Sequence, residues 1–331
     1  MHQHFSLHWQ RSLAVLLVVF LFNVVSVASA QDTYPSKPIR LVLPQPPGGA
    51  VDLVARQLAQ RLAESMGQQV VVDNRPGANG IIAAELVAKA PADGYTLLLA
   101  VDTNLVVNPN LYRQLPYDPY RDFSPISVLA KVGLVLVAHP SVPANSVTEL
   151  IALAKANPGK LNYASLGSGT QQHLGMEFFK SIAGISITHI PYKGTAPAMA
   201  DLLGGAVSIM FTGMPSALAQ AKSGKLKLLA VTSPERSGLA PQLPTMVEAG
   251  VPGFELSAWF GLLAPANSPV RVTERITQEV AKAVANREFR TNLQNQGLDP
   301  LGSTPEAMLA LMKSDTEKWA RVIRDSGAKV E

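Results

Sequence analysis

Residues 39–66 read IRLVLPQPPGGAVDLVARQLAQRLAESM and contain, in order, a predicted strand, a turn and a helix. The strand is expected at residues 39–43, where branched apolar residues are enriched and Pro44 follows. Residues 45–49 include two prolines and two glycines, which favour neither regular structure. Asp52 is then expected to open a helix whose apolar stripe faces the core. The stripe consists of Val51, Val54, Ala55, Leu58, Leu62 and Met66.

A helix that begins directly after a glycine turn presents unpaired backbone N–H groups, and such a site favours an anion. Two further glycine turns precede predicted helices, at residues 167–170 and residues 193–195. None of the three turns carries the P-loop ending or the three-glycine dinucleotide fingerprint, so a nucleotide is not indicated. One helix end contributes about 0.3–1 kcal/mol, whereas removing a carboxylate from water costs several kcal/mol. We therefore expect two or three turns to close together on one small carboxylate.

The first 30 residues are predicted to be a cleaved signal peptide. The apolar run at residues 13–28 spans about 24 Å as a helix, less than the roughly 30 Å of a hydrocarbon core, and this disfavours a membrane anchor. Ala28-Ser29-Ala30 fits a cleavage site. The chain has no cysteine, hence neither a disulfide nor a lipidated N-terminal cysteine. With a net charge of only +4 and no basic cluster, nucleic acid is a poor candidate partner. We expect a soluble protein of the periplasm.

The remaining chain alternates predicted strands and helices, which indicates parallel strands joined by right-handed crossovers. Residues 126–138 are interpreted as two extended runs broken at residues 131–133. The predicted fold is α/β with two lobes, in which two mixed sheets are flanked by helices and joined by two crossings. Residues 31–132 and 258–331 are expected to form the first lobe, and residues 133–257 an inserted second lobe. A ligand is expected between the lobes, at the carboxyl ends of strands.

Catalytic chemistry has little support in the residue pattern. The segment Leu166-Gly167-Ser168-Gly169 does not match a serine elbow, so a hydrolase that uses Ser168 is only a minor alternative. His139, His173 and His189 are not at metal-ligand spacing, and a closed zinc site without cysteine is not expected. The sequence therefore predicts no catalytic residue, no metal and no cofactor. His173 falls in the first turn of a predicted helix, from which it could face the cleft.

Short motifs follow one another in a fixed order beyond residue 30. They are YPSKPI (34–39), PGGAVD (47–52), DNRPGA (73–78), DGYTL (93–97), LPYDP (115–119), YAS (163–165), HL (173–174), PYKG (191–194), AVTS (230–233), PTMVEAG (244–250), PGF (252–254) and KW (318–319). In this order the chain resembles the Bug-type solute-binding proteins of tripartite tricarboxylate transporters, over essentially its whole length beyond the signal peptide.

The resemblance implies a two-lobe periplasmic binding protein of the second class, without enzymatic activity. Members of that family bind small carboxylates, including di- and tricarboxylic acids and aromatic acids. They deliver the ligand to the membrane subunits of a transporter or to a sensor kinase, and we expect a monomer. Carried over by position, the ligand-binding residues are Gln45, Pro46, Pro47, Gly48, Gly49, Ser165, Gly167, Ser168, Gly169, Thr170, His173, Tyr192, Lys193, Gly194 and Thr212.

Two positions depart from the pattern of that family. Gln45 stands where an aromatic residue is usual, which makes this part of the cleft wall more polar. Thr212 follows Phe211 where an aspartate is often found. An aspartate there could pair with a ligand ammonium group, and threonine cannot. We therefore hypothesise that the ligand lacks an amino group.

Overall fold

The computed structural model describes residues 34–326, so the predicted signal peptide lies outside the described residues. The helices and strands belong to the compact unit that begins at Lys37. The strand β1 pairs in parallel with both β2 and β3, which confirms the predicted parallel arrangement. The first elements are β1 (Ile39–Leu43), α2 (Ala50–Met66), β2 (Val70–Asn74), η1 (Ala78–Gly80), α3 (Ile81–Ala88), β3 (Thr96–Val101), η2 (Thr103–Val107) and α4 (Asn108–Leu111).

The helix α2 buries the apolar stripe that the sequence predicts, from Val51 through Met66. It begins at Ala50, so the expectation that Asp52 opens it is wrong by two residues. The glycines allow this earlier start, because Gly49 is the N-cap residue and does not interrupt the turn. At the other end, Gly67 adopts the left-handed conformation and donates its N–H to the carbonyl of Ala63, which terminates the helix.

The strand β4 (Phe123–Ala138) is continuous, and the predicted break at residues 131–133 is wrong. What changes at this point is the set of partners. Up to Gly133, β4 pairs antiparallel with β9 (Ser257–Pro265), and from Leu134 onward it pairs with β7 and β8. A side chain at Gly133 would lie 2.9 Å from the Cβ of Ser233, so this close approach requires glycine. The pattern at residues 131–133 therefore marks the point at which β4 changes its partner strands, and not the end of a strand.

A second set of alternating elements follows β4. Here β5 pairs in parallel with β6 and β7, whereas β4 is antiparallel to β7 and β8. The predicted helices after the glycine turns at residues 167–170 and 193–195 are both present. The elements are α5 (Val147–Ala156), β5 (Asn162–Ser165), α6 (Gln171–Ala183), β6 (Thr188–Pro191), α7 (Thr195–Leu203), β7 (Ile209–Gly213), α8 (Met214–Lys222) and β8 (Lys227–Val231).

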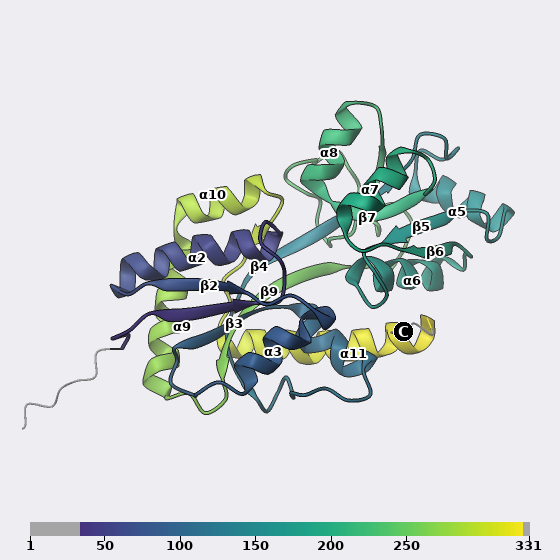
Figure 1. Ribbon diagram of the computed structural model, residues 1–331. Helices are drawn as coiled ribbons and strands as arrows, with labels where there is room; N and C mark the ends of the chain where they lie inside the picture. The colour runs from purple at the N-terminus through teal and green to yellow at the C-terminus, as the bar shows by residue number, and fades with distance from the viewer. Residues whose placement is uncertain (1–33, 327–331) are drawn as a thin grey trace, which may run out of the picture. The chain divides into compact units, whose positions relative to one another are not determined.

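The strands form one hydrogen-bonded path in the order β2-β1-β3-β9-β4-β7-β5-β6, with β8 and β10 (Asp299–Pro300) also paired to β4. We call β1, β2, β3, β9, β10 and the first part of β4 the first lobe. The second lobe consists of β5 to β8 and the remainder of β4. Among the described strands, β4 alone pairs with strands of both groups, and Gly133 lies opposite Ser257, the first residue of β9, where its partners change (Figure 1). The residue limits of the two lobes stay a prediction.

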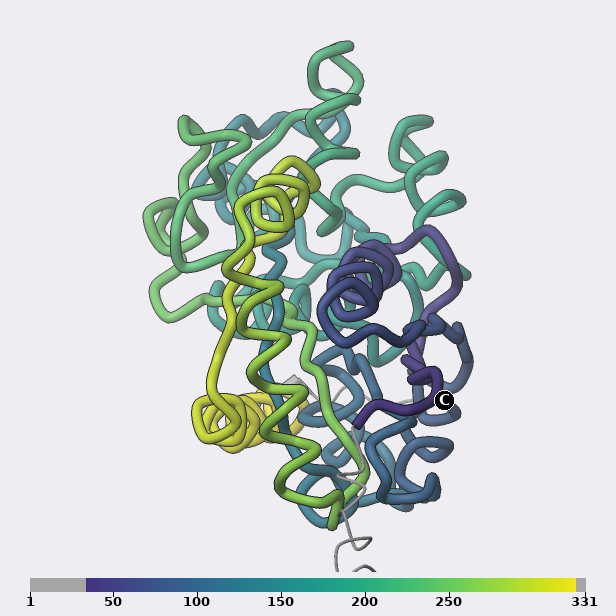
Figure 2. Tube along the Cα trace, turned by 90° about the vertical axis from the view of Figure 1, so that its left-hand side faces the viewer, coloured from purple at the N-terminus to yellow at the C-terminus, as the bar shows by residue number. Residues whose placement is uncertain are grey.

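The carboxyl-terminal part is helical, with α9 (Val270–Ala285), α10 (Arg287–Asn295) and α11 (Pro305–Ser326). The predicted helices at residues 270–285 and from Pro305 are confirmed, and α10 was not predicted. Figure 2 shows α2 and α11 end-on, with α9, which packs against α2, running across the view. The helix α11 packs against η2 of the first lobe and α6 of the second. None of the helices within residues 34–326 is long and apolar enough to cross a membrane.

Candidate functional site

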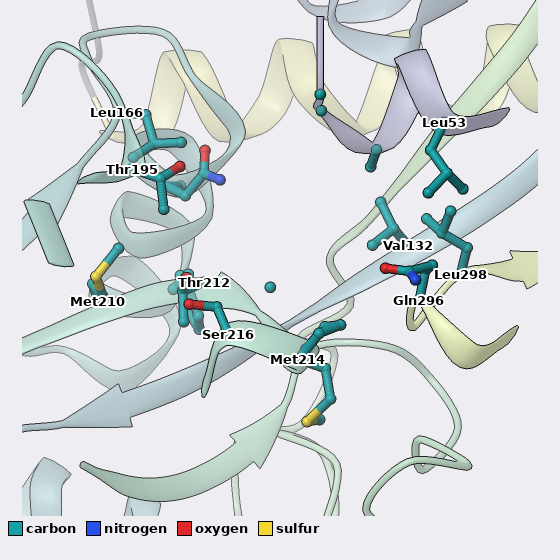
Figure 3. Close-up of a pocket in the computed structure, with 17 residues that line it drawn as sticks. Leu53, Val132, Leu166, Thr195, Met210, Thr212, Met214, Ser216, Gln296 and Leu298 are labelled. Atoms are coloured by element: carbon teal, nitrogen blue, oxygen red, sulfur yellow. The ribbon is translucent and has the colours of Figure 1, made fainter. Parts of the chain in front are cut away.

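A cavity of about 360 Å³ is lined by residues of both lobes. Figure 3 shows Leu53, Val132 and Leu298 on one side of it and Leu166, Thr195 and Met210 on the other. The wall therefore combines segments that lie far apart in the sequence, including the region between α10 and β10. The complete lining consists of Gly48, Gly49, Ala50, Leu53, Val132, Leu166, Gln172, Thr195, Met210, Phe211, Thr212, Gly213, Met214, Pro215, Ser216, Gln296 and Leu298.

Four helices begin at this cavity. Each follows a strand and a short turn, as in β1–α2, β5–α6, β6–α7 and β7–α8. The lining includes one or more first-turn residues of each helix, namely Ala50, Gln172, Thr195 and Met214. Because the N-terminal N–H groups of a helix carry partial positive charge, these four ends give the cavity a positive potential without any cationic side chain. Three of the turns were predicted; the fourth, before α8, was not.

None of these four helices has a side-chain cap. Their N-cap residues are Gly49, Thr170, Gly194 and Gly213, and no side chain of theirs accepts a first-turn N–H. By contrast, Ser146, Asn286 and Thr304 cap α5, α10 and α11 with their side-chain oxygens. The helices α3 and α9 also lack such a cap, so the missing cap does not by itself indicate a ligand. The convergence of four uncapped helix ends on one cavity, however, does indicate a ligand.

The side chains that line the cavity are uncharged. Among the described residues of the lining there is neither a basic nor an acidic side chain. Polar groups come from Gln172, Thr195, Thr212, Ser216 and Gln296, and the remainder is apolar or backbone. Thr212 and the apolar residues before it on β7 are buried. Such a wall can hydrogen-bond a polar ligand and also enclose an apolar one.

The first-lobe turn is held by the buried carboxylate of Asp52, which is only 4% exposed. It accepts the N–H of Gly48 at 3.0 Å and two hydrogen bonds from Arg56 at 2.9 and 3.0 Å. It also accepts from Asn74, whose amide donates in turn to the carbonyl of Gln45. Burial opposes ionisation of Asp52, but the bonds from Arg56, Gly48 and Asn74 prevail and lower its pKa below the ordinary value. Asp52 thus holds both ends of the turn.

In the second lobe, Ser165 and His189 lie 2.6 Å apart between Oγ and Nε2. Contact of this kind is found between a nucleophile and its base. Here, however, Ser165 is fully buried, and its Oγ also accepts the N–H of Gly167. The hydroxyl therefore holds the turn at residues 167–170. Within residues 34–326, no group of three His, Cys, Asp or Glu side chains could hold a metal ion.

Two predicted residues next to α7 already have partners within the protein or face solvent. The hydroxyl of Tyr192 donates to Asp201 at 2.6 Å, and burial and this bond raise the pKa of Tyr192 to about 12. Lys193 is exposed. Thr195, which belongs to the predicted turn at residues 193–195 but was not among the predicted ligand-binding residues, lines the cavity.

Residues 54–328 match the model of the "Tripartite tricarboxylate transporter family receptor". The chain belongs to this family. It is 38% identical over 322 residues to the protein BugT of Bordetella pertussis, with 97% of this chain and 99% of that protein covered. The resemblance to the Bug-type proteins is thereby confirmed.

Solved structures give the same result for the fold of this receptor-family chain. The R. palustris protein Rpa4515, solved with adipate, superposes with a TM-score of 0.81 at 36% identity, covering 90% of this chain and all of that one. The periplasmic binding protein BugD superposes with a TM-score of 0.78, also at 36% identity and with the same coverage. The predicted two-lobe periplasmic-binding-protein fold is confirmed.

The structure brings only part of the predicted site to the cavity of this receptor. Gly48, Gly49 and Thr212 line it, and so does Thr195 of the predicted turn at residues 193–195. Leu166 and Gln172 line it beside predicted residues of the turn at residues 167–170. Met214, Ser216, Gln296 and Leu298 had no signal of their own in the sequence, although Gly213 before Pro215 is a helix-start pattern. The predicted residues that are absent from the described lining are Gln45, Pro46, Pro47, Ser165, Gly167, Ser168, Gly169, Thr170, His173, Tyr192, Lys193 and Gly194. The ligand-binding set stays a prediction.

Proposed function

We propose that this protein is a periplasmic receptor that captures a small carboxylate between its two lobes and delivers it to the membrane subunits of a tripartite transporter. The observation that carries the proposal is the convergence of α2, α6, α7 and α8 at one uncharged cavity. The adipate bound to Rpa4515, at 36% identity, supports a carboxylate as the ligand class. The family itself supports the transporter as the partner and a binding role instead of an enzymatic one.

Helix ends can replace a cationic side chain at this site. Each end contributes about 0.3–1 kcal/mol, and up to about 2 kcal/mol when partly buried. A hydrogen bond from an N–H group to a charged oxygen contributes about 1.5–3 kcal/mol. Burial of the carboxylate costs several kcal/mol. Two ends, one from each lobe, with two or three such bonds are sufficient to offset that cost, and this couples binding to closure of the lobes.

The uncharged wall also supports a ligand without an ammonium group. Thr212 lines the cavity and is only 2% exposed, and no carboxylate is found elsewhere in the described lining. An ammonium group would be buried there without an anionic partner, which costs several kcal/mol. We therefore favour dicarboxylic or aromatic acids over acidic amino acids. Export through a cleaved peptide at residues 1–30 is part of the same proposal.

Calorimetric titration of the purified protein tests the proposal. The panel contains adipate, malate and benzoate, with neutral adipamide as the matched control for charge and 2-aminoadipate as the control for an ammonium group. We expect at least one acid to bind with a Kd of about 100 µM or lower. We expect adipamide and 2-aminoadipate to bind at least about tenfold more weakly than adipate, since one lost charge–amide interaction is worth about 1.4 kcal/mol or more.

The titration tests three parts of the proposal separately: recognition of charge, exclusion of an ammonium group, and binding of any acid. If adipamide binds as tightly as adipate, the helix ends do not recognise charge. Tight binding of 2-aminoadipate alone would refute the absence of an ammonium group while leaving a carboxylate receptor intact. If none of the acids binds, the receptor proposal is wrong.

A further inference from the structure

The turn at residues 167–170 uses its own backbone N–H groups to bind two buried side chains. Gly169 donates its N–H to Nδ1 of His173 at 3.1 Å, and Gly167 donates to Oγ of Ser165 at 3.1 Å. Both glycines have positive φ, +79° and +120°, and these bonds help to hold that conformation, together with the bond from the hydroxyl of Thr170 to the carbonyl of Gly167 at 2.7 Å. Leu166, before the turn, and Gln172, after it, line the cavity. The shape of the turn therefore decides where the N-terminus of α6 lies.

The two side chains that accept from this turn, Ser165 and His173, are linked through His189, which stacks on His173 and contacts Ser165. The rings of His173 and His189 are 4.3 Å apart between centroids at an angle of 25°. Nε2 of His189 lies 2.6 Å from Oγ of Ser165, which is the group that accepts from Gly167. An unbroken series of contacts thus runs from Gly169 through both imidazoles to Gly167. His173 is only 7% exposed, so it meets the turn and not the cavity.

The bond from Gly169 fixes the protonation state of His173. An atom that accepts an N–H cannot itself carry a proton, so Nδ1 is unprotonated and a doubly protonated ring would repel Gly169. Burial lowers the pKa of His173 below that of an ordinary histidine. Burial and the neighbouring His173 lower the pKa of His189 to about 4. Stacking of two imidazoles favours the same neutral state, because two adjacent imidazolium rings repel.

The charged groups that face the histidines do not reverse this preference. Glu177 of α6 would favour a protonated ring, and Lys180 of the same helix opposes it. Lys180 donates to Oε1 of Glu177 at 2.6 Å, and Tyr163 of β5 donates to the same oxygen at 2.6 Å. The ring of Tyr163 also stacks on His189, 4.8 Å between centroids. The carboxylate is thereby occupied by other donors, and both imidazoles stay neutral near pH 7.

We propose that His173 and His189 are positioning residues, which hold the turn at residues 167–170 for the bound anion, and that acid releases the ligand by protonating His173 at the nitrogen that accepts from Gly169. The inference rests on the proposed carboxylate receptor and names how its second-lobe site is kept in shape. The histidines act through the backbone of the turn and do not touch the ligand. Because burial holds the pKa of His173 below that of an ordinary histidine, and His189 beside it has a pKa of about 4, binding should be constant near neutrality and fail only in acid.

Titration of adipate into four proteins between pH 7.5 and pH 4 tests the inference. They are the natural protein, His173→Asn, His173→Leu and the control His139→Asn. Asparagine keeps an acceptor oxygen near the place of Nδ1 but does not titrate, whereas leucine has no acceptor. His139 contacts Ser141, away from the turn. Affinities are compared as ratios at each pH, so the titration of adipate itself cancels.

At pH 7.5 we expect His173→Leu to bind at least about tenfold more weakly, and His173→Asn and His139→Asn to bind within about threefold of the natural protein. Toward pH 4 the natural protein and His139→Asn should lose affinity about tenfold more than His173→Asn. Unchanged binding by His173→Leu would overturn the positioning role. An equal acid loss in His173→Asn would overturn the acid release.

Hydrogen exchange of the peptide spanning residues 166–172 keeps the inference testable if His173→Leu binds too weakly to titrate. We expect faster exchange at Gly169 in His173→Leu, without ligand, and unchanged exchange in α9. Uniformly faster exchange would indicate global destabilisation and would overturn the local role. If the natural protein binds no acid at pH 7.5, the receptor proposal itself fails, and this inference fails with it.

Discussion

The glycine turns of the two lobes have the same backbone design and different chemistry. In each, a glycine with positive φ precedes the N-cap residue and donates its N–H to the side chain four residues later. Gly48 donates to Asp52 in the first lobe, and Gly169 donates to His173 in the second. Asp52 is ionised and paired with Arg56, whereas His173 is neutral and stacked. The start of α2 is thus held by an ionised side chain, and the start of α6 by a neutral one.

This difference separates the responses of the two turns to pH. The pKa of Asp52 lies below that of an ordinary aspartate, so its contribution is present at neutral pH and is lost only in strong acid. A neutral histidine contributes fully above about pH 6.5, and its contribution is lost as the pH falls through its lowered pKa. On acidification the second-lobe turn should therefore loosen before the first-lobe turn does.

The largest expected effect comes from replacing Asp52. Asp52→Leu removes the acceptor of Gly48 and the partners of Arg56 and Asn74, within a nearly buried site. We expect the free energy of unfolding to fall by about 3 kcal/mol. We also expect adipate affinity to fall at least about tenfold. Urea denaturation and calorimetry measure the two quantities.

The matched variant Asp52→Asn separates charge from hydrogen bonding. Asparagine can still accept the N–H of Gly48 but cannot form the ion pair with Arg56, which is more than half exposed and contributes little. We expect Asp52→Asn to retain most of the affinity. If it binds as weakly as Asp52→Leu, the first-lobe turn depends on charge for its shape, and the parallel with His173 is lost.

A smaller effect is expected from alanine at a glycine of the turn. Gly48 has φ +87°, and a Cβ there would meet no atom within 4 Å, so the cost is backbone strain alone. We expect Gly48→Ala to lower stability by about 1–2 kcal/mol and to weaken adipate binding. Gly184 ends α6 with φ +63° and is equally open, so Gly184→Ala should lower stability similarly without changing affinity. Equal affinity losses in the two variants would show that strain, wherever placed, weakens binding.

The sequence predicted the turns but not the bonds that hold them. Prolines and glycines at residues 45–49 exclude regular structure locally, and the apolar stripe of α2 follows a period of 3.6 residues. These are short-range signals. The bond from Gly169 to His173 also spans only four residues, but His173 was predicted as a residue that could face the cleft and not as a partner of the turn. The inward side chain of His173 on α6 stacks on His189, which comes from strand β6, and this contact is not visible in the local sequence.

Long-range contacts account for the other misses. Gln296 and Leu298 reach the cavity because β10 pairs with β4, a contact across more than 160 residues that no local pattern indicates. The strand β4 looked broken at residues 131–133 because glycine disfavours strands. Its continuity depends on β9 and β7 pairing with its two halves. The start of α8 was visible as Gly213 before Pro215, yet its place at the cavity follows only from the order of the strands.

The smallest effect, and the one that tests contact between the end of β3 and the start of α6, concerns Asp102. This carboxylate is 1% exposed at the end of β3, and it accepts from the backbone of Thr103 and, at 3.4 Å, from the amide of Gln171, the first residue of α6. Burial and then the nearby Asp315 raise the pKa of Asp102 to about 7. A raised carboxyl pKa means that the folded protein holds a proton that the unfolded chain has lost. Its contribution is therefore complete below about pH 4 and disappears as the pH rises through 7.

Asp102→Asn removes this titration while keeping an acceptor for Thr103. We expect the variant to gain about 1 kcal/mol in free energy of unfolding relative to the natural protein between pH 6 and pH 8, measured by urea denaturation at each pH. The direction is opposite to that of the histidine pair, which weakens in acid. If the difference between the two proteins does not change with pH, Asp102 is ionised throughout. Its contact with Gln171 would then join the first-lobe region to the second-lobe helix as a permanent charge, and only the histidines would make closure depend on pH.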